Sequence, residues 1–404
     1  MEKSYPNGLT VAKCSEHDFG AELDQLCRAK ISELVQAYLC FEVDEALERA
    51  RYQRSECAAS KGYRNGFDEP RTITTSAGPI DIRRPRVKGM KHQSAILPKY
   101  ARRLPSVDRT LHRLWIEGLA DRDFERSLRG LLGESAPLSA STIARTNAKF
   151  LDEYKTWCTR SLADRDYVYV WADGIHLGAG PDDERRVLLV LIAADADGIK
   201  HFLALEEAMT ESEQSWIELF DRLKDRGLRT PKLIIADGAN GLWAAATKAF
   251  ADTAQQRCWL HKIRNVLDKV PETKRAVVHA ELREVMHAET ESIARRRMES
   301  LARALQPDYP KAATCLRDDI DRQLSFYRFP QANWKSLRTT NPIESIFASV
   351  RLRTDAAKRM RTGTSATYLL YALITRLSTN WRRIDGHREI RNLLRRDLDS
   401  IQAA

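Results

Sequence analysis

Three carboxylates fall where short, distinctive sequence phrases end. Asp173 closes the phrase YVYVWAD, Asp237 closes KLIIAD and Glu344 closes TTNPIE. The first two acids stand where an apolar run stops, which predicts the edge of a sheet, and the third opens an amphipathic helix. Three acids that converge repel one another unless a cation holds them. Because Mg²⁺ takes oxygen ligands, and paired Mg²⁺ ions about 4 Å apart can clamp an in-line phosphoryl displacement, the pattern predicts a metal-dependent polynucleotidyl transferase.

Each acid also has an ordinary structural explanation. An Asp at a strand end is commonly a turn residue or a helix cap, and Asp237-Gly238 by itself is typical of a turn. The three are favoured together because they fall on the first strand, the fourth strand and a late helix of one predicted fold. The competing acids lie in predicted turns or follow the third strand in the sequence: Asp182, Asp183, Asp195, Asp197, Glu206 and Glu207.

A Cys-x-x-His element, Cys258 to His261, lies at the predicted fifth strand. No second pair stands nearby, so the spacing matches structural zinc sites poorly and Cys258 is more simply a buried thiol. His261 is expected at the same edge as the acids, where it would position a scissile phosphate or assist proton transfer. His176 follows Asp173 closely, and a surface histidine explains it equally well.

Composition bounds the class of protein. The 404 residues suggest two or three domains, and 43% apolar residues can fill a sizeable core. The sequence contains no run of about 18 apolar residues, so no membrane span is expected, and the N-terminus lacks a secretory pattern. Seven cysteines, an odd number without a CxxC, favour reduced thiols in a cytosolic setting. We therefore expect a cytoplasmic protein.

Positive charge is clustered as well as abundant. The net charge is +10, with 13 Lys/Arg against 5 Asp/Glu from Arg83 to Arg129, and 5 against 1 from Arg351 to Arg361. Clustered cations can neutralise phosphates, although a solvated basic surface is the alternative. The predicted DNA-contacting residues are Arg84, Arg86, Lys88, Arg126, Arg129, Arg145, Lys149, Arg338, Asn341, Arg351 and Arg353.

The N-terminal part is predicted to be mainly helical with one β-hairpin. Apolar spacing indicates a helix over about 18–58, which GYRNG (62–66) interrupts. A hairpin follows over 72–86, with a four-residue turn at 76–79. Three helical segments, 107–119, 121–132 and one from Ser139, are compatible with a helix-turn-helix DNA reader, and an ordinary helical hairpin explains them equally well.

From Asp166 the pattern changes to a mixed sheet. Strands are predicted over 167–177, 186–194, 200–205, 233–236 and 256–260, with helices over 212–226 and around 242–250. Three antiparallel strands, a helix, a strand, a helix and a strand give the ribonuclease-H-like order. Residues 262–330 are predicted to be a helical insertion, followed by helices over 342–352 and 366–381. Arg338 to Asn341 would hold a phosphate at a helix N-terminus, cap that helix with Asn341 before Pro342, or do both.

The predicted fold class is therefore α/β: a ribonuclease-H-like mixed-sheet core with a helical insertion, preceded by a mainly helical N-terminal DNA-binding region with a β-hairpin. The predicted domains are a helical segment (1–60), a basic β-hairpin region (61–105), a helix-turn-helix-like region (106–165), the first part of the core (166–270), the insertion (271–335) and the last part of the core with C-terminal helices (336–404).

The ordered phrases WADG, IIADG, QRCWLHK and RTTNPIESIFASVRLRT resemble the Mutator-type transposases of bacterial insertion sequences, the IS256 family. The resemblance runs from about Gly62 to Trp381 and includes SASTIAR from Ser139. It is weaker in DAAKRMRTGTSATY after Arg353, and the first 60 or so residues match only loosely.

Members of that family are DDE transposases with a ribonuclease-H-like core that a helical insertion interrupts. The resemblance implies that Asp173, Asp237 and Glu344 are the catalytic, metal-binding acids, with two Mg²⁺ ions or Mn²⁺ in substitution. It implies that the family's Cys-x-x-His element falls on Cys258 and His261. The implied partners are double-stranded DNA, as terminal inverted repeats and target, and a second copy of the chain on DNA. A nuclease without strand transfer, and an inactive transposase-derived DNA-binding protein, are the alternatives.

Overall fold

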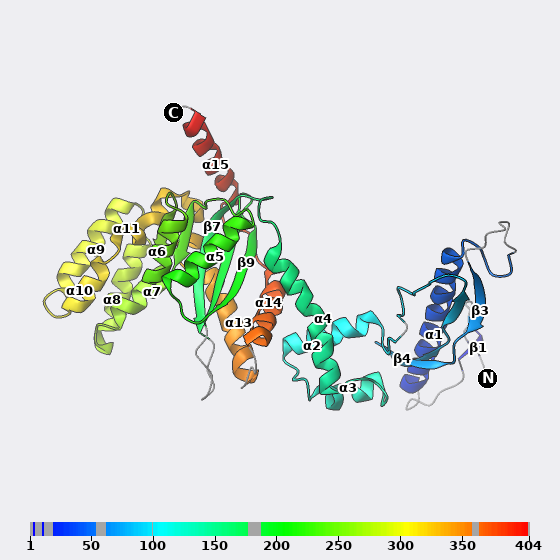
Figure 1. Cartoon of the computed structure of the whole chain (residues 1–404). Coiled ribbons are helices and arrows are strands. Elements are labelled where there is room, and N and C mark those ends of the chain that lie inside the picture. Colours follow the sequence, from blue (N-terminus) through cyan, green and yellow to red (C-terminus); the bar gives the residue numbers. More distant parts are fainter. Residues whose placement is uncertain are drawn as a thin grey trace. The chain divides into compact units, whose positions relative to one another are not determined.

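The chain forms two compact units, Met1–Phe150 and Leu151–Ala404 (Figure 1). The computed structural model describes the backbone of residues 3–4, 10–11, 19–53, 62–98, 100–176, 187–357 and 363–402. It describes the side chains of residues 19–53, 62–98, 100–176, 187–351 and 367–395. No helix among the described residues is long and apolar enough to cross a membrane.

The first unit begins with a helix packed on small antiparallel ribbons. These elements are β1 (Lys3–Ser4), β2 (Thr10–Val11), α1 (Phe19–Ala46), β3 (Tyr63–Phe67), β4 (Arg71–Thr75), β5 (Gly78–Ile82) and β6 (Pro85–Lys88). β1 pairs with β2, β4 pairs with β5, and β3 pairs with β6, each pair antiparallel. Leu39 of α1 packs with Ile73, Ile80 and Ile82 of the hairpin, so apolar burial fixes the helix on the ribbon.

The predicted hairpin is confirmed, with three corrections around it. Its turn has two residues rather than four, because Gly78 and Pro79 already pair with Thr75 and Thr74 as part of β5. The GYRNG segment was expected to interrupt structure but forms most of strand β3. The first helix ends at Ala46 rather than near residue 58, and a turn that includes Glu48 at φ 51° follows it.

Three helices complete the first unit, as the sequence predicts: α2 (Pro105–Glu117), α3 (Phe124–Leu132) and α4 (Ala140–Thr159), the last of which continues into the second unit. Pro105 begins α2, where its missing N–H is not needed. The side chains of Val107, Leu111, Phe124 and Ile143 form the shared core of the three helices.

The second unit is built on a five-stranded mixed sheet, so the predicted mixed α/β class is confirmed. The strands are β7 (Tyr167–His176), β8 (Val187–Asp195), β9 (Lys200–Ala208), β10 (Leu233–Ala236) and β11 (Ala254–Arg257), in the order β11-β10-β7-β8-β9. β8 runs antiparallel to both β7 and β9, whereas β10 is parallel to both β7 and β11. Every residue of β8 is buried, as its nearly continuous apolar run predicts.

These strand directions bring four strand ends to one edge of the sheet. Since β9, β10 and β11 all run in the direction of β7, their carboxyl ends lie at the same edge as the carboxyl end of β7. We call this the carboxyl edge. The opposite edge holds the β8–β9 turn, where Gly198 adopts φ 70° as the Asp197-Gly198 pair predicts.

Helices cover both faces of the sheet. On one face, Val170 and Ala172 of β7 pack with residues of α5 (Glu213–Asp225) and α6 (Asn240–Ala249). Tyr169 and Trp171 point to the opposite face because side chains alternate along a strand. There Tyr169 bonds to Asn333 and Trp171 to the carbonyl of Ser336, beside α13 (Asn341–Ala357), which contacts β7 and β8. α14 (Gly363–Ser378) contacts β9.

The predicted helical insertion is confirmed, and Figure 1 shows its helices stacked beside the sheet. The remaining helical elements are α7 (Trp259–Leu267), α8 (Glu272–Met286), α9 (Glu291–Leu305), α10 (Pro310–Arg317), α11 (Ile320–Leu324), the 3₁₀ turns Ser325–Arg328 and Gln331–Asn333, α12 (Trp334–Leu337) and α15 (His387–Gln402). One boundary was wrong: the fifth strand ends at Arg257 rather than Leu260, because Cys258 is already the N-cap residue of α7.

Candidate active site

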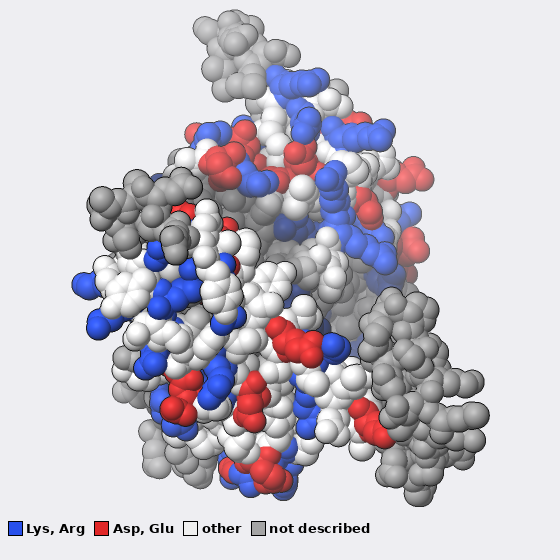
Figure 2. Space-filling view, turned by 90° about the vertical axis from the view of Figure 1, so that its right-hand side faces the viewer, with Lys and Arg blue, Asp and Glu red and all other residues white. Residues whose placement is uncertain are grey.

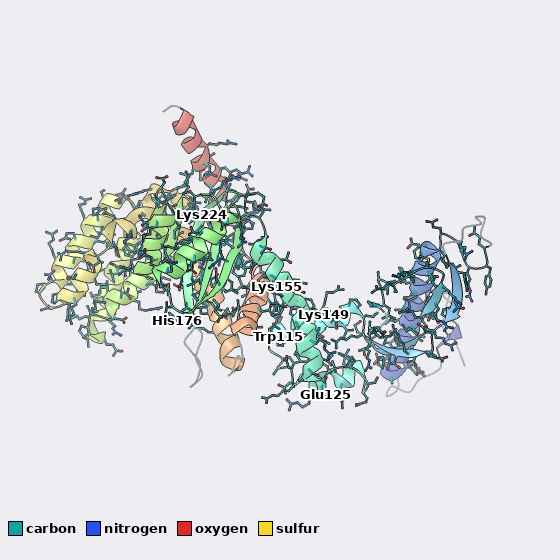
Figure 3. All side chains as sticks on the ribbon, in the orientation of Figure 1. Trp115, Glu125, Lys149, Lys155, His176 and Lys224 are labelled. Carbon is teal, nitrogen blue, oxygen red and sulfur yellow. The ribbon has the colours of Figure 1, made fainter. Side chains whose placement is uncertain are left out.

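Asp173 and Asp237 come together at the carboxyl edge because their strands are parallel neighbours. Ile235 of β10 is level with Trp171 of β7. Two residues further along each strand, Asp237 is therefore level with Asp173. Figure 3 labels His176, at the end of β7, at this same edge. The sequence-based expectation that the two strands would be neighbours is confirmed.

The turn after Asp237 is built by its own carboxylate. Asp237 Oδ1 accepts the backbone N–H of Ala239 at 2.9 Å, which starts the turn into α6. Gly238 between them has φ 109°, a conformation that favours glycine. A Cβ there would also lie 2.5 Å from Nε of Arg257, so glycine is needed for space as well. The turn and the metal interpretations of Asp237-Gly238 are thus compatible.

Asp173 is a buried acid among other acids. Only 9% of its surface is exposed. Burial and then repulsion from Asp237 raise the pKa of Asp173 from 3.8 to about 8, and Glu211 and Glu344 add to that repulsion. The N–H of Gly174, which donates to Asp173 Oδ1 at 2.9 Å, opposes the shift. The ionised carboxylate is therefore unfavourable here unless a positive charge accompanies it.

Glu344 reaches the site from the first turn of α13. Its backbone N–H donates to the carbonyl of Thr340, which makes Thr340 rather than Asn341 the residue that caps the helix. The buried Thr340 hydroxyl donates to Glu344 Oε1 at 2.9 Å. This bond fixes the carboxylate, and α13 itself lies against β7 and β8. The predicted cap moves by one residue, and Asn341 and Pro342 form the start of the helix.

Cys258 contacts Thr340, the residue that caps α13. Its Sγ accepts a hydrogen bond from the backbone N–H of Thr340 at 3.3 Å and lies 3.3 Å from the hydroxyl oxygen of the same residue. Burial raises the pKa of the Cys258 thiol, although the contacts with Thr340 oppose the shift. Because a metal ligand must be a thiolate, this environment favours a structural thiol. The interpretation of Cys258 as a buried thiol agrees with its complete burial.

His261 lies on the first turn of α7, beside Glu344. Its Nδ1 is 3.6 Å from Glu344 Oε1, and this buried nitrogen has no hydrogen-bond partner among the described residues. Ligand atoms of Cys258, His261 and Glu344 all lie within 4.8 Å of one another. The structure therefore brings His261 to the acids, as predicted, but from a helix N-terminus rather than from a strand end.

A fourth carboxylate, Glu211, was missed by the sequence reasoning, which considered Glu206 and Glu207 instead. Glu211 lies between β9 and α5, at the carboxyl edge, with 18% of its side chain exposed. Burial and repulsion from Asp237 raise the pKa of Glu211 from 4.5 to about 7. A usable signal existed: the third strand of such a sheet runs parallel to the first, so an acid just beyond it reaches the same edge.

The four acids lack basic partners within the described part of the chain. No Lys or Arg nitrogen there lies within 4.0 Å of their carboxylate oxygens, and their ion-pair contacts are to His176 and His261. The nearby Arg257 is bound to Asp319 at 3.0 Å instead. Clustered carboxylate oxygens without fixed cations are the donor set that a hard divalent cation takes.

The predicted DNA-contacting residues of the second unit have different surroundings. The Arg338 guanidinium stacks over Phe326 and Trp334, at 4.9 and 5.7 Å from the ring centroids, and bonds to His287 at 3.0 Å. These contacts give Arg338 a structural role. Asn341 and Arg351 are exposed on α13. The side chain of Arg353 lies outside the described residues.

In the first unit, two predicted DNA contacts share a groove. Arg84 and Lys149 line it together with Arg103, Tyr100 and His92. The other predicted cations are exposed or half-buried, and some are paired: Arg86 with Asp68, Arg126 with Asp123, and Arg129 with Glu125 and Glu134, whereas Lys88 and Arg145 are exposed. Figure 2 shows Lys and Arg interleaved with Asp and Glu on the face that it displays.

The family is decided by comparison with known proteins. The model of the Mutator family of transposases matches residues 7–384. This chain belongs to the Mutator family of transposases. It is 39% identical over 273 residues to the transposase for insertion sequence element IS6120 of Mycolicibacterium smegmatis, covering 68% of this chain and 84% of that protein.

More distant relatives extend the match along the chain. The transposase for insertion sequence element ISRM5 of Rhizobium meliloti is 28% identical over 88% of both chains. The transposase for insertion sequence element IS256 in transposon Tn4001 of Staphylococcus aureus is 26% identical over 83% of this chain and 86% of that protein. The predicted family is confirmed, and its membership supports a DNA transposase function for this chain.

Proposed function

We propose that this chain is a DDE transposase that binds the terminal inverted repeats of its own insertion sequence and catalyses metal-dependent DNA cleavage and strand transfer. What supports the proposal is that Asp173 and Asp237 stand at the ends of parallel neighbouring strands, and that Glu344 is near enough to Asp173 to interact with its charge. These acids are more than sixty residues apart in the sequence. Burial raises the pKa of Asp173 first, and the charges of Asp237 and Glu344 raise it further.

The sheet supports a ribonuclease-H-like core for this function. Three antiparallel strands, β7 to β9, are followed by β10 and β11, which add in parallel on the other side of β7. Helices α5 and α6 cover one face and α13 the other. The proposed catalytic acids then occupy the end of the first strand, the end of the fourth strand and the helix that follows the insertion.

The chemistry assigns a role to each side chain. Asp173, Asp237 and Glu344 would hold two Mg²⁺ ions, or Mn²⁺ in substitution. Bound there, the ions supply a water-derived nucleophile and stabilise charge on the reacting phosphate. Thr340 holds Glu344 in place through its hydroxyl. His261, beside Glu344, positions the scissile phosphate.

Two displacements follow from this arrangement. Water attacks the phosphodiester at the end of the element, the P–O3′ bond breaks, and a 3′-hydroxyl is released. That hydroxyl then attacks a target phosphodiester in line. The new P–O bond joins the two DNAs, the target P–O3′ bond breaks, and a target 3′-hydroxyl is released. No side chain forms a covalent bond to DNA. The acids hold the reacting groups in place, and their negative charge is offset by the bound cations.

Recognition of double-stranded DNA is assigned to the first unit, with a dimer or higher oligomer acting on the two ends. The groove that contains Arg84 and Lys149 offers cations for phosphate contacts, and Arg145 adds one on the exposed surface of α4. Asp108 in the same groove lies 3.4 Å from Lys149 and limits the net charge. Binding should therefore weaken steeply as salt rises.

A strand-transfer assay with pre-cut inverted-repeat ends tests the proposal. Wild-type protein should join those ends to target DNA in Mg²⁺, and Asp173→Ala should lose both cleavage and joining while retaining end binding. Asp252→Ala, which removes an exposed acid on the same unit, is the matched control. Cleavage without joining would instead identify a hydrolytic nuclease. Binding without either reaction in wild type would identify an inactive DNA-binding descendant, and joining by Asp173→Ala would remove Asp173 from the mechanism.

A further inference from the structure

Glu211 lies against the backbone beside Asp173. An ideal Cβ built at Gly174 would be only 2.7 Å from Glu211 Oε2 and 2.9 Å from Glu211 Cδ. A side chain at position 174 would therefore occupy the space that the Glu211 carboxylate fills. Gly174 lies within β7 and does not have a positive φ, so its backbone conformation does not require glycine. Glu211 and Val187 Cγ1, which would be 3.2 Å from the same Cβ, together leave little room for a side chain at this position.

The acids near Glu211 in the sequence have other partners. Glu206 forms an ion pair with Arg222, and Glu213 forms one with Lys248 at 2.6 Å. Glu207 accepts a hydrogen bond from Thr367 at 3.3 Å. Glu211 Oε2 instead lies 4.0 Å from Nε2 of His176, at the end of β7. Glu211 is near enough to Asp173 and Asp237 to interact with both electrostatically.

A second observation indicates that a ligand belongs here. Asp173 is about nine-tenths buried, and among the described residues its hydrogen bond comes only from the N–H of its own neighbour, Gly174. A buried carboxylate close to further acids is costly unless something positive compensates it. Glu211 adds a further negative charge near Asp173. That charge would destabilise a cluster of acids without a cation, and it would strengthen the binding of a cation.

We propose that Glu211 supplies a fourth carboxylate to the divalent-cation site of Asp173 and Asp237, and that Gly174 is required to admit it. The proposal rests on the proposed function, because it adds a residue to the same site. The ligand is a hard divalent cation, for which the number of charged oxygens sets the affinity. Glu211 thereby raises the affinity for the cation before DNA binds.

The test measures Mn²⁺ binding to the full-length protein without DNA, by the loss of the free Mn²⁺ electron paramagnetic resonance signal. Glu211→Gln keeps the shape of the side chain and removes its charge, and we expect the dissociation constant to rise by at least about tenfold. Gly174→Ala should weaken binding in the same direction by displacing Glu211. Glu213→Gln, two residues away and paired with Lys248, should bind as wild type does.

The double variant Gly174→Ala, Glu211→Gln tests whether Gly174 affects Mn²⁺ binding through Glu211 or independently of it. If Gly174 acts through Glu211, the double variant binds Mn²⁺ no more weakly than Glu211→Gln does. Wild-type affinity in Glu211→Gln would overturn the inference and, if Asp173→Asn still abolishes binding, would leave the proposed function intact. Undiminished Mn²⁺ binding by Asp173→Asn would instead contradict the proposed function itself.

Discussion

Two buried aspartates occupy opposite ends of the same pair of strands and have opposite surroundings. Asp195 ends β8, level with the first residue of β7, whereas Asp173 lies near the last residues of β7. Asp195 accepts the N–H groups of Asp197 and Ile199, both at 2.9 Å, and lies 2.8 Å from Nε2 of His201. Among the described residues, Asp173 accepts a hydrogen bond only from the N–H of its own neighbour, and it lies near three other acids.

The pKa values of the two carboxyls record that difference. Burial alone would raise the pKa of Asp195, but hydrogen bonds from His201 and from the N–H groups of Ile199 and Asp197 lower it below its usual range. The pKa of Asp173 is raised to about 8, first by burial and then by Asp237. The protein thus supplies Asp195 with hydrogen-bond donors of its own, whereas the proposed function assigns the compensation of Asp173 to a bound cation. Burial alone therefore does not mark a functional acid, whereas burial without donors does.

The largest expected effect is the loss of activity when Asp173 is replaced. Asp173→Asn should lower DNA cleavage and strand transfer by about 10³-fold or more, since several kcal/mol of transition-state stabilisation depend on the cation. The unfolding temperature of the cation-free protein should not fall, because an amide stays neutral at every pH, whereas keeping the Asp173 carboxyl protonated above pH 3.8 costs stability. Cleavage of labelled end DNA and calorimetry measure the two effects, and a variant that is destabilised but active would reverse the assignment.

The matched change at Asp195 should lower the stability of the protein and leave its activity nearly unchanged. Asp195→Ala leaves two backbone N–H groups and His201 without their acceptor, which should lower the free energy of unfolding by about 1–3 kcal/mol. The turnover of the folded protein should stay near that of wild type, measured well below the unfolding midpoint. Loss of cleavage in protein that circular dichroism shows to be folded would mean that Asp195 also serves the reaction.

A smaller effect is expected from the residue that orients Glu344. Thr340→Val keeps the volume of the side chain but removes the donor to Glu344 Oε1 and the polar contact with Cys258 Sγ. Loss of one orienting hydrogen bond, about 1 kcal/mol, should lower the cleavage rate by roughly tenfold or less and leave end binding unchanged. Thr340→Ser retains the hydroxyl and should recover most of the rate. Equal rates for the Val and Ser variants would exclude this orienting role.

The smallest effect concerns stability against pH in the absence of divalent cations. Because the folded pKa of Asp173 lies above its unfolded value, the folded state holds a proton that the unfolded state releases. The associated stability is fully present below pH 3.8 and is lost as the pH rises to about 8. Relative to Asp173→Asn, the wild-type unfolding temperature should therefore decline over this window by a few degrees.

Added Mg²⁺ should change this profile, because cation binding replaces the proton. The rise in unfolding temperature on adding Mg²⁺ should be larger at pH 8 than at pH 5, and protons should be released into a weakly buffered solution. Asp195→Ala should keep the same Mg²⁺ response as wild type. A Mg²⁺ effect that is independent of pH, or that persists in Asp173→Asn, would separate the cation from this carboxyl.

Much of this site could be predicted from the sequence because its positions follow from periodicity. Apolar runs that stop at Asp173 and Asp237 mark strand ends, and parallel neighbouring strands bring their ends to one edge. Glu344 was found because an amphipathic pattern follows it. These are local signals that tertiary structure did not override.

The remaining features depend on contacts that the local sequence does not encode. Glu211 lies in a connection without periodicity, and only the direction of β9 reveals which edge it reaches. The strand expected over 256–260 instead ends at Arg257, because Trp259 and Leu260 are equally compatible with a buried helix start. Arg338 looked like a phosphate contact from its charge, yet the aromatic rings of Phe326 and Trp334 that hold it come from the insertion and the segment after it.

The most direct test is a crystal of the full-length chain soaked in Mn²⁺ and measured at the manganese absorption edge. The account predicts an anomalous peak within coordination distance of Asp173 and Asp237, with Glu344 and Glu211 oxygens at the same ion or at a second one, and no peak at Asp195. Manganese at another place in the molecule, with these carboxylates still free of it, would contradict the account.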